Sequence, residues 1–122
     1  MDREALDDGA WVLFVPDFLA RRGEDPDALL NELRATLPLR QERVRVAGRV
    51  HPTPRLTSWH GDPGCAYAYS GRVFAPHPWT AALDRLRDRL APICGVRFDS
   101  VLVNYYRDDA DSIAAHSDDE SE

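Results

Sequence analysis

The clearest structural signal in the chain is the apolar run from Phe98 to Tyr106, which predicts a β-strand near the end of the sequence. Because side chains alternate along a strand, its residues divide into two faces. One face holds Leu102, Asn104 and Tyr106, and the other holds Val101, Val103 and Tyr105. An amide and a phenol therefore project from the same side of an otherwise apolar strand. On position alone, an ordinary edge Asn and a core Tyr explain them more simply than a ligand contact does.

Further strands are expected upstream. The run Trp11–Val15 is β-prone and is closed by Pro16, which predicts a buried strand. The alternating residues 43–46 predict a half-exposed strand with arginines outward, followed by a loop or hairpin over residues 48–54. Two more short strands are expected at residues 56–59 and 66–69, with a Gly- and Pro-rich turn at residues 60–64 between them.

Two helices are expected between these strands. Asp25 and Pro26 suit an N-cap and a first turn, and leucines then recur at helical spacing until Pro38. A second helix is expected to open at His77-Pro78 and to end at the C-cap residue Gly95. Its apolar stripe consists of Leu83, Leu86, Leu90 and Ile93. The order of elements predicts a mainly β domain with flanking helices, of the α+β class.

The size and the charges of the chain narrow its class. With 122 residues and 43% apolar content, it forms at most one domain and has enough apolar side chains for a core. All 15 basic residues are Arg, and seven of the 21 acids lie in the last fifteen residues. One basic cluster stands out, and it has only Glu42 as a nearby acid. It consists of Arg40, Arg43, Arg45, Arg49 and Arg55. Arg suits phosphate recognition, but this patch alone falls short of a nucleic-acid signature.

Location is predicted from the cysteines and the apolar runs. Cys65 and Cys94 lie far apart and outside any CxxC pattern, and the chain shows no signal peptide, so we expect reduced thiols and a cytoplasmic protein. No apolar run is long enough to cross a membrane, so no membrane contact is expected.

A His-x-Asp pair, His116 and Asp118, follows the strand. In extended or turn geometry both side chains lie on one side of the backbone and can grip one ion. Imidazole with carboxylate suits Fe(II), where two His and one carboxylate form a facial triad, but also Mn or Zn. The chain holds a second copy, His60 and Asp62, and on spacing alone a solvated loop explains either copy more simply than a ligand pair.

Several segments, taken in order, resemble the AlkB family. They are Pro54–Gly61, Tyr67–Gly71, His77–Trp79, Phe98–Arg107, Asp111–Ser112 and His116–Glu120. AlkB proteins are 2-oxoglutarate-dependent Fe(II) dioxygenases that oxidatively demethylate alkylated DNA and RNA bases. The resemblance runs from about Arg43 to Glu120 and implies an enzyme that repairs lesions such as N-methylated adenine and cytosine, releasing formaldehyde.

Position by position, the resemblance implies roles for seven residues. It implies that His116 and Asp118 are iron ligands and that Asn104 and Tyr106 contact the co-substrate 2-oxoglutarate. It also implies that Tyr67 and Tyr69 line the base pocket and that Asp119 reads the flipped base. An enzyme that acts on a base must extrude it and hold it against aromatic faces, which agrees with these assignments. For each tyrosine, core packing is the alternative; Trp59 and Trp79 are better explained as core.

The resemblance also predicts a fold that this chain completes only in part. The family fold is a double-stranded β-helix (jelly-roll). We expect a single, truncated domain over residues 1–122, with an outer layer at 1–97 and the first strand or strands of the inner roll at 98–122. The family's distal His ligand and its pair of arginines that grip the co-substrate are not in this sequence. We therefore expect weak iron binding and no turnover by this chain alone, and a complementing chain that supplies the missing strands.

Three functions are compatible with this sequence. In the first, the chain is the N-terminal portion of an AlkB-like demethylase that acts on alkylated DNA or RNA. Since Val46-Ala47-Gly48 has no bulky side chain to wedge into a duplex, a single-stranded substrate is the better expectation. In the second, the chain is a non-catalytic fragment or degenerate paralogue that binds a partner chain. The third is a metal-binding β-domain of another class, such as a cupin-like protein.

Overall fold

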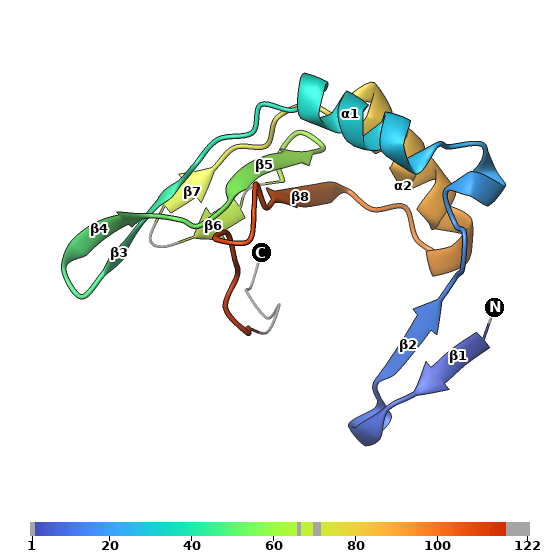
Figure 1. Cartoon of the computed structure of the whole chain (residues 1–122). Coiled ribbons are helices and arrows are strands. Elements are labelled where there is room, and N and C mark those ends of the chain that lie inside the picture. Colours follow the sequence, from blue (N-terminus) through green and yellow to red (C-terminus); the bar gives the residue numbers. More distant parts are fainter. Residues whose placement is uncertain (1, 66, 70–71, 117–122) are drawn as a thin grey trace.

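Two helices lie side by side at one end of the molecule (Figure 1). The computed structural model describes residues 2–65, 67–69 and 72–116. Helix α1 spans Pro26–Thr36, and the Asp25 side chain caps it by accepting a hydrogen bond from the Asp27 amide at 3.0 Å. It ends because Leu37 precedes Pro38, and a residue before proline is held out of helical geometry. The predicted helix start is confirmed.

Helix α2 spans Ala81–Cys94, and Thr80 caps it by accepting a hydrogen bond from the Leu83 amide at 3.3 Å. Its C-cap is Gly95, whose φ of 72° is cheap only without a side chain, so that prediction is confirmed. The expected start at His77-Pro78 was wrong by one turn. A cap needs a side-chain oxygen, and Thr80 is the residue that supplies it.

Ion pairs and a small apolar core join the two helices. Arg85 of α2 donates to Glu24 at 2.8 Å and to Glu32 of α1 at 2.5 Å, and Arg89 reaches Glu24 at 2.9 Å. Hydrogen bonds from Arg85 hold the pKa of the Glu32 carboxyl below its ordinary value. The buried apolar side chains of the described residues are Leu29, Leu37, Ala82 and Leu83. All four lie in or directly after α1 or in α2, so the core sits at the two helices.

Eight described strands form four separate two-stranded antiparallel sheets. Their bounds are β1 Asp2–Ala5, β2 Trp11–Phe14, β3 Arg43–Val46, β4 Arg49–Pro52, β5 Leu56–Gly61, β6 Tyr67–Tyr69, β7 Arg72–Phe74 and β8 Ser100–Tyr105. The pairs are β1 with β2, β3 with β4, β5 with β8, and β6 with β7. None of these sheets closes on itself. A sheet-rich domain with two helices is confirmed, and the partial jelly-roll stays a prediction.

The N-terminal hairpin extends from the end of the molecule where the two helices lie (Figure 1). It consists of β1 and β2 joined by the short 3-10 helix η1 (Asp7–Gly9), and a second 3-10 helix, η2 (Ala20–Arg22), leads toward α1. The prediction of a buried strand at Trp11–Val15 was wrong, because Trp11 is 52% exposed and Phe14 is 73% exposed. An apolar strand is buried only if another element covers it, and within the described residues β2 pairs with β1 alone.

The sheet of β5 and β8 has two different faces. Its register pairs Ser58 with Val103 and His60 with Val101, and this face is covered: Ser58 and His60 are 4% and 1% exposed. The opposite face, with Leu102 and Asn104 of β8 beside Trp59 and Thr57 of β5, is more open. Asn104 therefore lies on the face away from the buried His60. No helix in the described part of the chain is both long and apolar enough to span a bilayer.

Candidate functional site

Asn104 is the predicted site residue with the most informative surroundings. It lies on β8 opposite Thr57, and its Oδ1 atom is buried without a hydrogen-bond partner among the described residues. A buried amide left unsatisfied costs about 1–3 kcal/mol, so such a group in a native fold points to a missing partner. Because a half-turn of the amide exchanges its oxygen for its NH2 group, Asn104 can bind a donor or an acceptor there. This fits a contact with a polar co-substrate.

Tyr106 immediately follows β8 and is 42% exposed. The next residue, Arg107, donates from Nε and Nη2 to the two carboxylate oxygens of Asp111, at 2.8 and 3.0 Å, and from its backbone amide at 2.8 Å. Hydrogen bonds from the Arg107 side chain and then from its backbone lower the pKa of Asp111 to about 2. A charged, bidentate pair thus closes the turn directly after the candidate co-substrate residues.

A second set of contacts anchors that turn to the start of β5. The Ser112 amide donates to the Pro54 carbonyl at 2.8 Å, and Arg55 Nη1 donates to the Ser112 carbonyl at 3.1 Å. The chain leading from β8 to His116 is therefore held at the β5 end of the sheet. Sequence reasoning placed Arg55 in a basic cluster and gave no role to the Arg107–Asp111 pair.

His116 is the last residue that the structure describes. Its imidazole is exposed, and Nδ1 lies 2.8 Å from the Ala114 carbonyl oxygen. That bond requires a proton on Nδ1, which leaves Nε2 as the nitrogen suited to a metal. Asp118 and Asp119 lie outside the described residues. Within the described ranges, no three His, Cys, Asp or Glu side chains gather closely enough to hold a metal ion.

Tyr67 and Tyr69 lie on the short strand β6. The register places them opposite Phe74 and Arg72 of β7. They are two residues apart on one strand, as expected from the sequence. Their roles in a base pocket stay a prediction.

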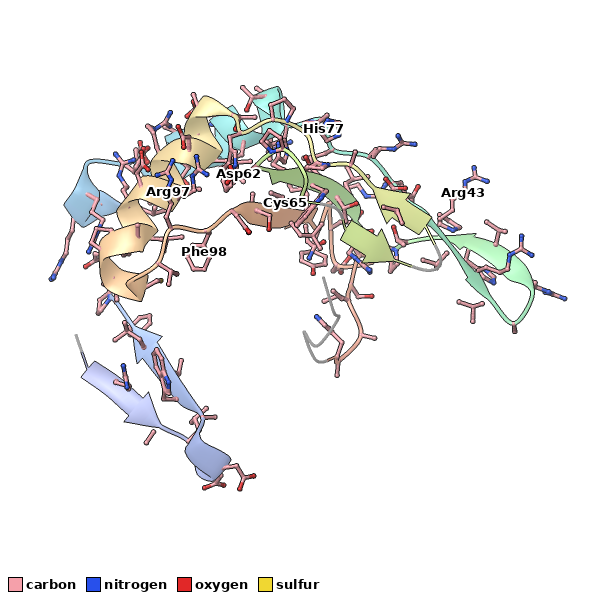
Figure 2. All side chains as sticks on the ribbon, turned by 180° about the vertical axis from the view of Figure 1, so that it is seen from behind. Arg43, Asp62, Cys65, His77, Arg97 and Phe98 are labelled. Carbon is pink, nitrogen blue, oxygen red and sulfur yellow. The ribbon has the colours of Figure 1, made fainter. Side chains whose placement is uncertain are left out.

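The predicted basic cluster divides into two parts. Arg40 pairs with Glu42 at 3.4 Å and Arg55 holds Ser112, so both have local partners. The other three, Arg43, Arg45 and Arg49, lie exposed on the β3–β4 hairpin and form no ion pair within the described part of the chain. We call residues 43–52 the basic ribbon; it contains no acid. It projects from the end of the molecule opposite the N-terminal hairpin, as the labelled Arg43 shows (Figure 2).

The tip of the basic ribbon is a two-residue turn. Ala47 and Gly48 both have positive φ, 51° and 78°, as a type I′ turn requires. Beside the turn, Val46 is 57% exposed and Val50 is 51% exposed. The tip therefore presents small apolar side chains between arginines. A hairpin in this region was one of the two expectations from the sequence, and it is confirmed.

The His60-x-Asp62 copy is structural, and the expectation of a solvated loop was wrong for His60. The ring of His60 is 1% exposed, its Nδ1 donates to the Pro78 carbonyl at 2.8 Å, and the Ser58 hydroxyl bonds to its Nε2. Asp62 accepts instead from Trp79 at 3.0 Å and from Arg87 at 3.3 Å. The two side chains serve different partners. The missed signal is strand alternation, which continues from Ser58 through His60.

The two tryptophans assigned to the core are half-buried and carry polar contacts. The Trp59 indole donates to the Cys65 carbonyl at 3.3 Å. The Arg87 guanidinium lies 3.8 Å from the Trp79 ring centroid, a cation–π contact. Arg87 is itself 8% exposed, and its ion pair with Asp84 is 2.6 Å long. Through Asp62, these contacts link the end of β5 to α2.

Comparison with known proteins gives a consistent set of similarities. Residues 12–122 match the model of the 2OG-Fe(II) oxygenase superfamily. The DNA oxidative demethylase ALKBH2 of Mus musculus is 44% identical over 80 residues, covering 66% of this chain and 34% of that protein. The alpha-ketoglutarate-dependent dioxygenase alkB homolog 3 of Rattus norvegicus is 37% identical over 110 residues, covering 89% of this chain and 36% of that protein. The chain thus spans about a third of the length of these relatives.

Proposed function

The chain belongs to the 2OG-Fe(II) oxygenase superfamily, and we propose that it contributes to AlkB-like oxidative demethylation of alkylated nucleic-acid bases. The observation that carries this proposal is the match over residues 12–122, together with relatives named as a DNA oxidative demethylase and an alkB homolog. The co-substrates are O₂ and 2-oxoglutarate, and the lesions are of the N-methylated adenine or cytosine type. The chain forms the first part of a jelly-roll domain.

We assign the metal and co-substrate contacts to this chain's own residues. His116 and Asp118 hold Fe(II), which supplies the oxidising chemistry when bound. Asn104 and Tyr106 bind 2-oxoglutarate, and the unsatisfied amide oxygen of Asn104 supports a polar ligand at that place. The Arg107–Asp111 pair acts indirectly: it fixes the turn that follows Tyr106. These residues bind and orient, and the cofactor brings the reactivity.

A second group of residues recognises the base. We assign Tyr67 and Tyr69 to the walls of the base pocket and Asp119 to hydrogen bonding with the base edge. The basic ribbon contacts the phosphate backbone, because its three arginines are exposed and the ribbon itself contains no acid. Ala47 and Gly48 at its tip are too small to replace an extruded base in a duplex stack. A single-stranded DNA or RNA substrate therefore fits better than a duplex.

A complementing polypeptide completes the site in this proposal. The described part of the chain exposes apolar side chains around β8, including Phe98 at 41%, Leu102 at 40% and Ile113 at 41%. The strands supplied by the complement would cover that surface and bring the third metal ligand. The alternative is a non-catalytic fragment or degenerate paralogue that binds a partner chain through the same surface. For either function we propose a cytoplasmic location, which the two free thiols of Cys65 and Cys94 support.

The test is a titration of the purified chain with Mn(II) in place of Fe(II), followed by electron paramagnetic resonance, with and without 2-oxoglutarate. We compare the unchanged chain with His116→Ala and with His51→Ala, an exposed histidine of the basic ribbon. Binding that needs His116, ignores His51 and tightens with 2-oxoglutarate supports the enzyme proposal. Binding that is the same in all three proteins favours the non-catalytic alternative.

Turnover is tested separately, by formaldehyde release from a methylated single-stranded oligonucleotide. We expect none from this chain alone, because two metal ligands hold Fe(II) weakly. Turnover by the isolated chain would contradict the need for a complement.

A further inference from the structure

The N-terminal hairpin, residues 2–14, carries charge opposite to that of the basic ribbon. It holds four acids and one arginine, and we call it the acidic ribbon. Arg3 lies over the Trp11 ring at 4.0 Å, whereas Glu4, Asp7 and Asp8 form no ion pair within the described residues. The acidic ribbon also exposes large apolar side chains. Trp11 is 52% exposed, Val12 is 45% exposed and Phe14 is 73% exposed.

Both ribbons combine charge and apolar surface on one face. In the acidic ribbon, the register pairs Glu4 with Val12, and Phe14 follows on the same side of the same strand. In the basic ribbon, Arg45 pairs with Val50, and Arg43 lies two residues before Arg45 on that face. The two faces therefore match in kind: carboxylates beside exposed apolar side chains on one, guanidiniums beside exposed apolar side chains on the other.

The two ribbons cannot meet within one molecule. They project from opposite ends of the structure, with the helices and the β5–β8 sheet between them (Figures 1 and 2). Two copies related by a two-fold axis can join both pairs at once, because each copy then offers its acidic ribbon to the basic ribbon of the other. Such a contact closes and does not propagate into a filament.

We propose that the acidic ribbon of one copy docks on the basic ribbon of a second copy, so that the chain self-associates through complementary charge. Arg43 and Arg45, on one face of the basic ribbon, meet the face of the acidic ribbon that holds Glu4, and the exposed Phe14, Val12 and Val50 side chains leave water in the same contact. Where the proposed function also holds, a polynucleotide competes for the same arginines, and binding it separates the copies.

The first experiment measures sedimentation velocity of the full chain over a series of protein concentrations, without nucleic acid. Because the screening length falls from about 30 Å at 10 mM salt to about 3 Å at 1 M, we expect association at low salt that is lost at high salt. Two variants reverse the charges: Arg43→Glu with Arg45→Glu, and Glu4→Arg with Asp7→Arg. Each variant alone carries two ribbons of like charge and should remain a monomer.

Mixing the two variants is the decisive experiment. In the mixture, each negatively charged ribbon of one variant can meet a positively charged ribbon of the other. We expect the mixture to associate as the unchanged chain does, a recovery that misfolded variants could not give. The control Arg21→Glu changes an exposed arginine outside both ribbons and should leave association intact. A monomer under all conditions, a mixture that stays monomeric, or association indifferent to charge reversal would each overturn the proposal.

The competing polynucleotide is tested last, with a labelled single-stranded oligothymidylate. We expect it to shift the associated protein to a monomer–oligonucleotide complex. Self-association without any effect of the oligonucleotide would leave the docking intact and count against the proposed nucleic-acid contact alone.

Discussion

The imidazole of His60 lies with its Nδ1 atom 2.8 Å from the carbonyl oxygen of Pro78, which ties strand β5 to the segment that leads into α2. Backbone bonds reinforce the tie, because His77 donates to the Trp59 carbonyl at 2.8 Å and Gly61 donates to the His77 carbonyl at 3.1 Å. The rings of His60 and His77 are 5.5 Å apart. The buried ring and these backbone bonds thus join β5 to the segment that precedes α2.

Replacing the His60 ring should lower the stability of the fold. His60→Ala leaves the Ser58 hydroxyl and the Pro78 carbonyl without a partner and opens a cavity, so we expect the free energy of unfolding to fall by about 4 kcal/mol. Urea unfolding followed by circular dichroism measures it. The exposed His51→Ala should change stability by less than about 0.5 kcal/mol. Equal effects from both variants would contradict the structural role of His60.

The Arg107–Asp111 pair predicts an unusual acid titration. Since the folded pKa of Asp111 is lowered to about 2 from 3.8, the pair stabilises the fold above about pH 3.8 and loses that contribution as the pH falls through about 2. Carbon NMR of the Asp111 carboxyl should show a midpoint near 2. Arg107→Gln removes the charged donor and should move the midpoint back toward 3.8. An unmoved midpoint would show that Arg107 is not the cause.

Asn104→Ala separates ligand binding from stability. The variant removes a buried oxygen that has no partner among the described residues, so we expect the free energy of unfolding to stay within about 1 kcal/mol of its original value. The strengthening of metal binding by 2-oxoglutarate should disappear in the same variant. Calorimetry and the Mn(II) titration measure the two effects. A large loss of stability with 2-oxoglutarate binding retained would place Asn104 in the framework instead.

A substitution in the turn of the basic ribbon should stabilise the protein. Ala47 adopts a φ of 51°, which costs a residue with a Cβ atom about 1 kcal/mol, whereas Asn tolerates this region. Ala47→Asn should therefore raise the unfolding free energy by about 0.5 kcal/mol, and the β-branched Ala47→Val should lower it by more than about 1 kcal/mol. Thermal unfolding of both variants tests the order. The reverse order would mean that the turn has another geometry.

Local signals in the sequence predicted some elements well. Asp25 and Pro26 marked the start of α1, and Gly95 marked the end of α2, because caps depend on the chemistry of one or two residues. Whether another element covers an apolar strand was harder to predict. The apolar run at Trp11 indicated burial, but burial depends on whether another element packs on the strand, and that is not encoded within the run.

In the candidate site, too, local features were predicted from the sequence and long-range contacts were not. The alternation of β8 correctly grouped Asn104 with Leu102 on one face, since strand periodicity is local. The role of His60 was not predicted, because its partner Pro78 lies eighteen residues away and only the fold brings them together. The anchoring of Ser112 by Arg55 was missed for the same reason, across fifty-seven residues.

The two cysteines differ in the reactivity expected of their thiols. Burial, followed by the nearby charges of Asp99 and Asp62, raises the pKa of the Cys65 thiol, whereas Cys94 lies exposed at the end of α2. The thiolate is the reactive form, so maleimide reagents near neutral pH should modify Cys94 first. A fluorophore can thus be attached at one chosen point of the unaltered protein, ready to report on whatever binds nearby.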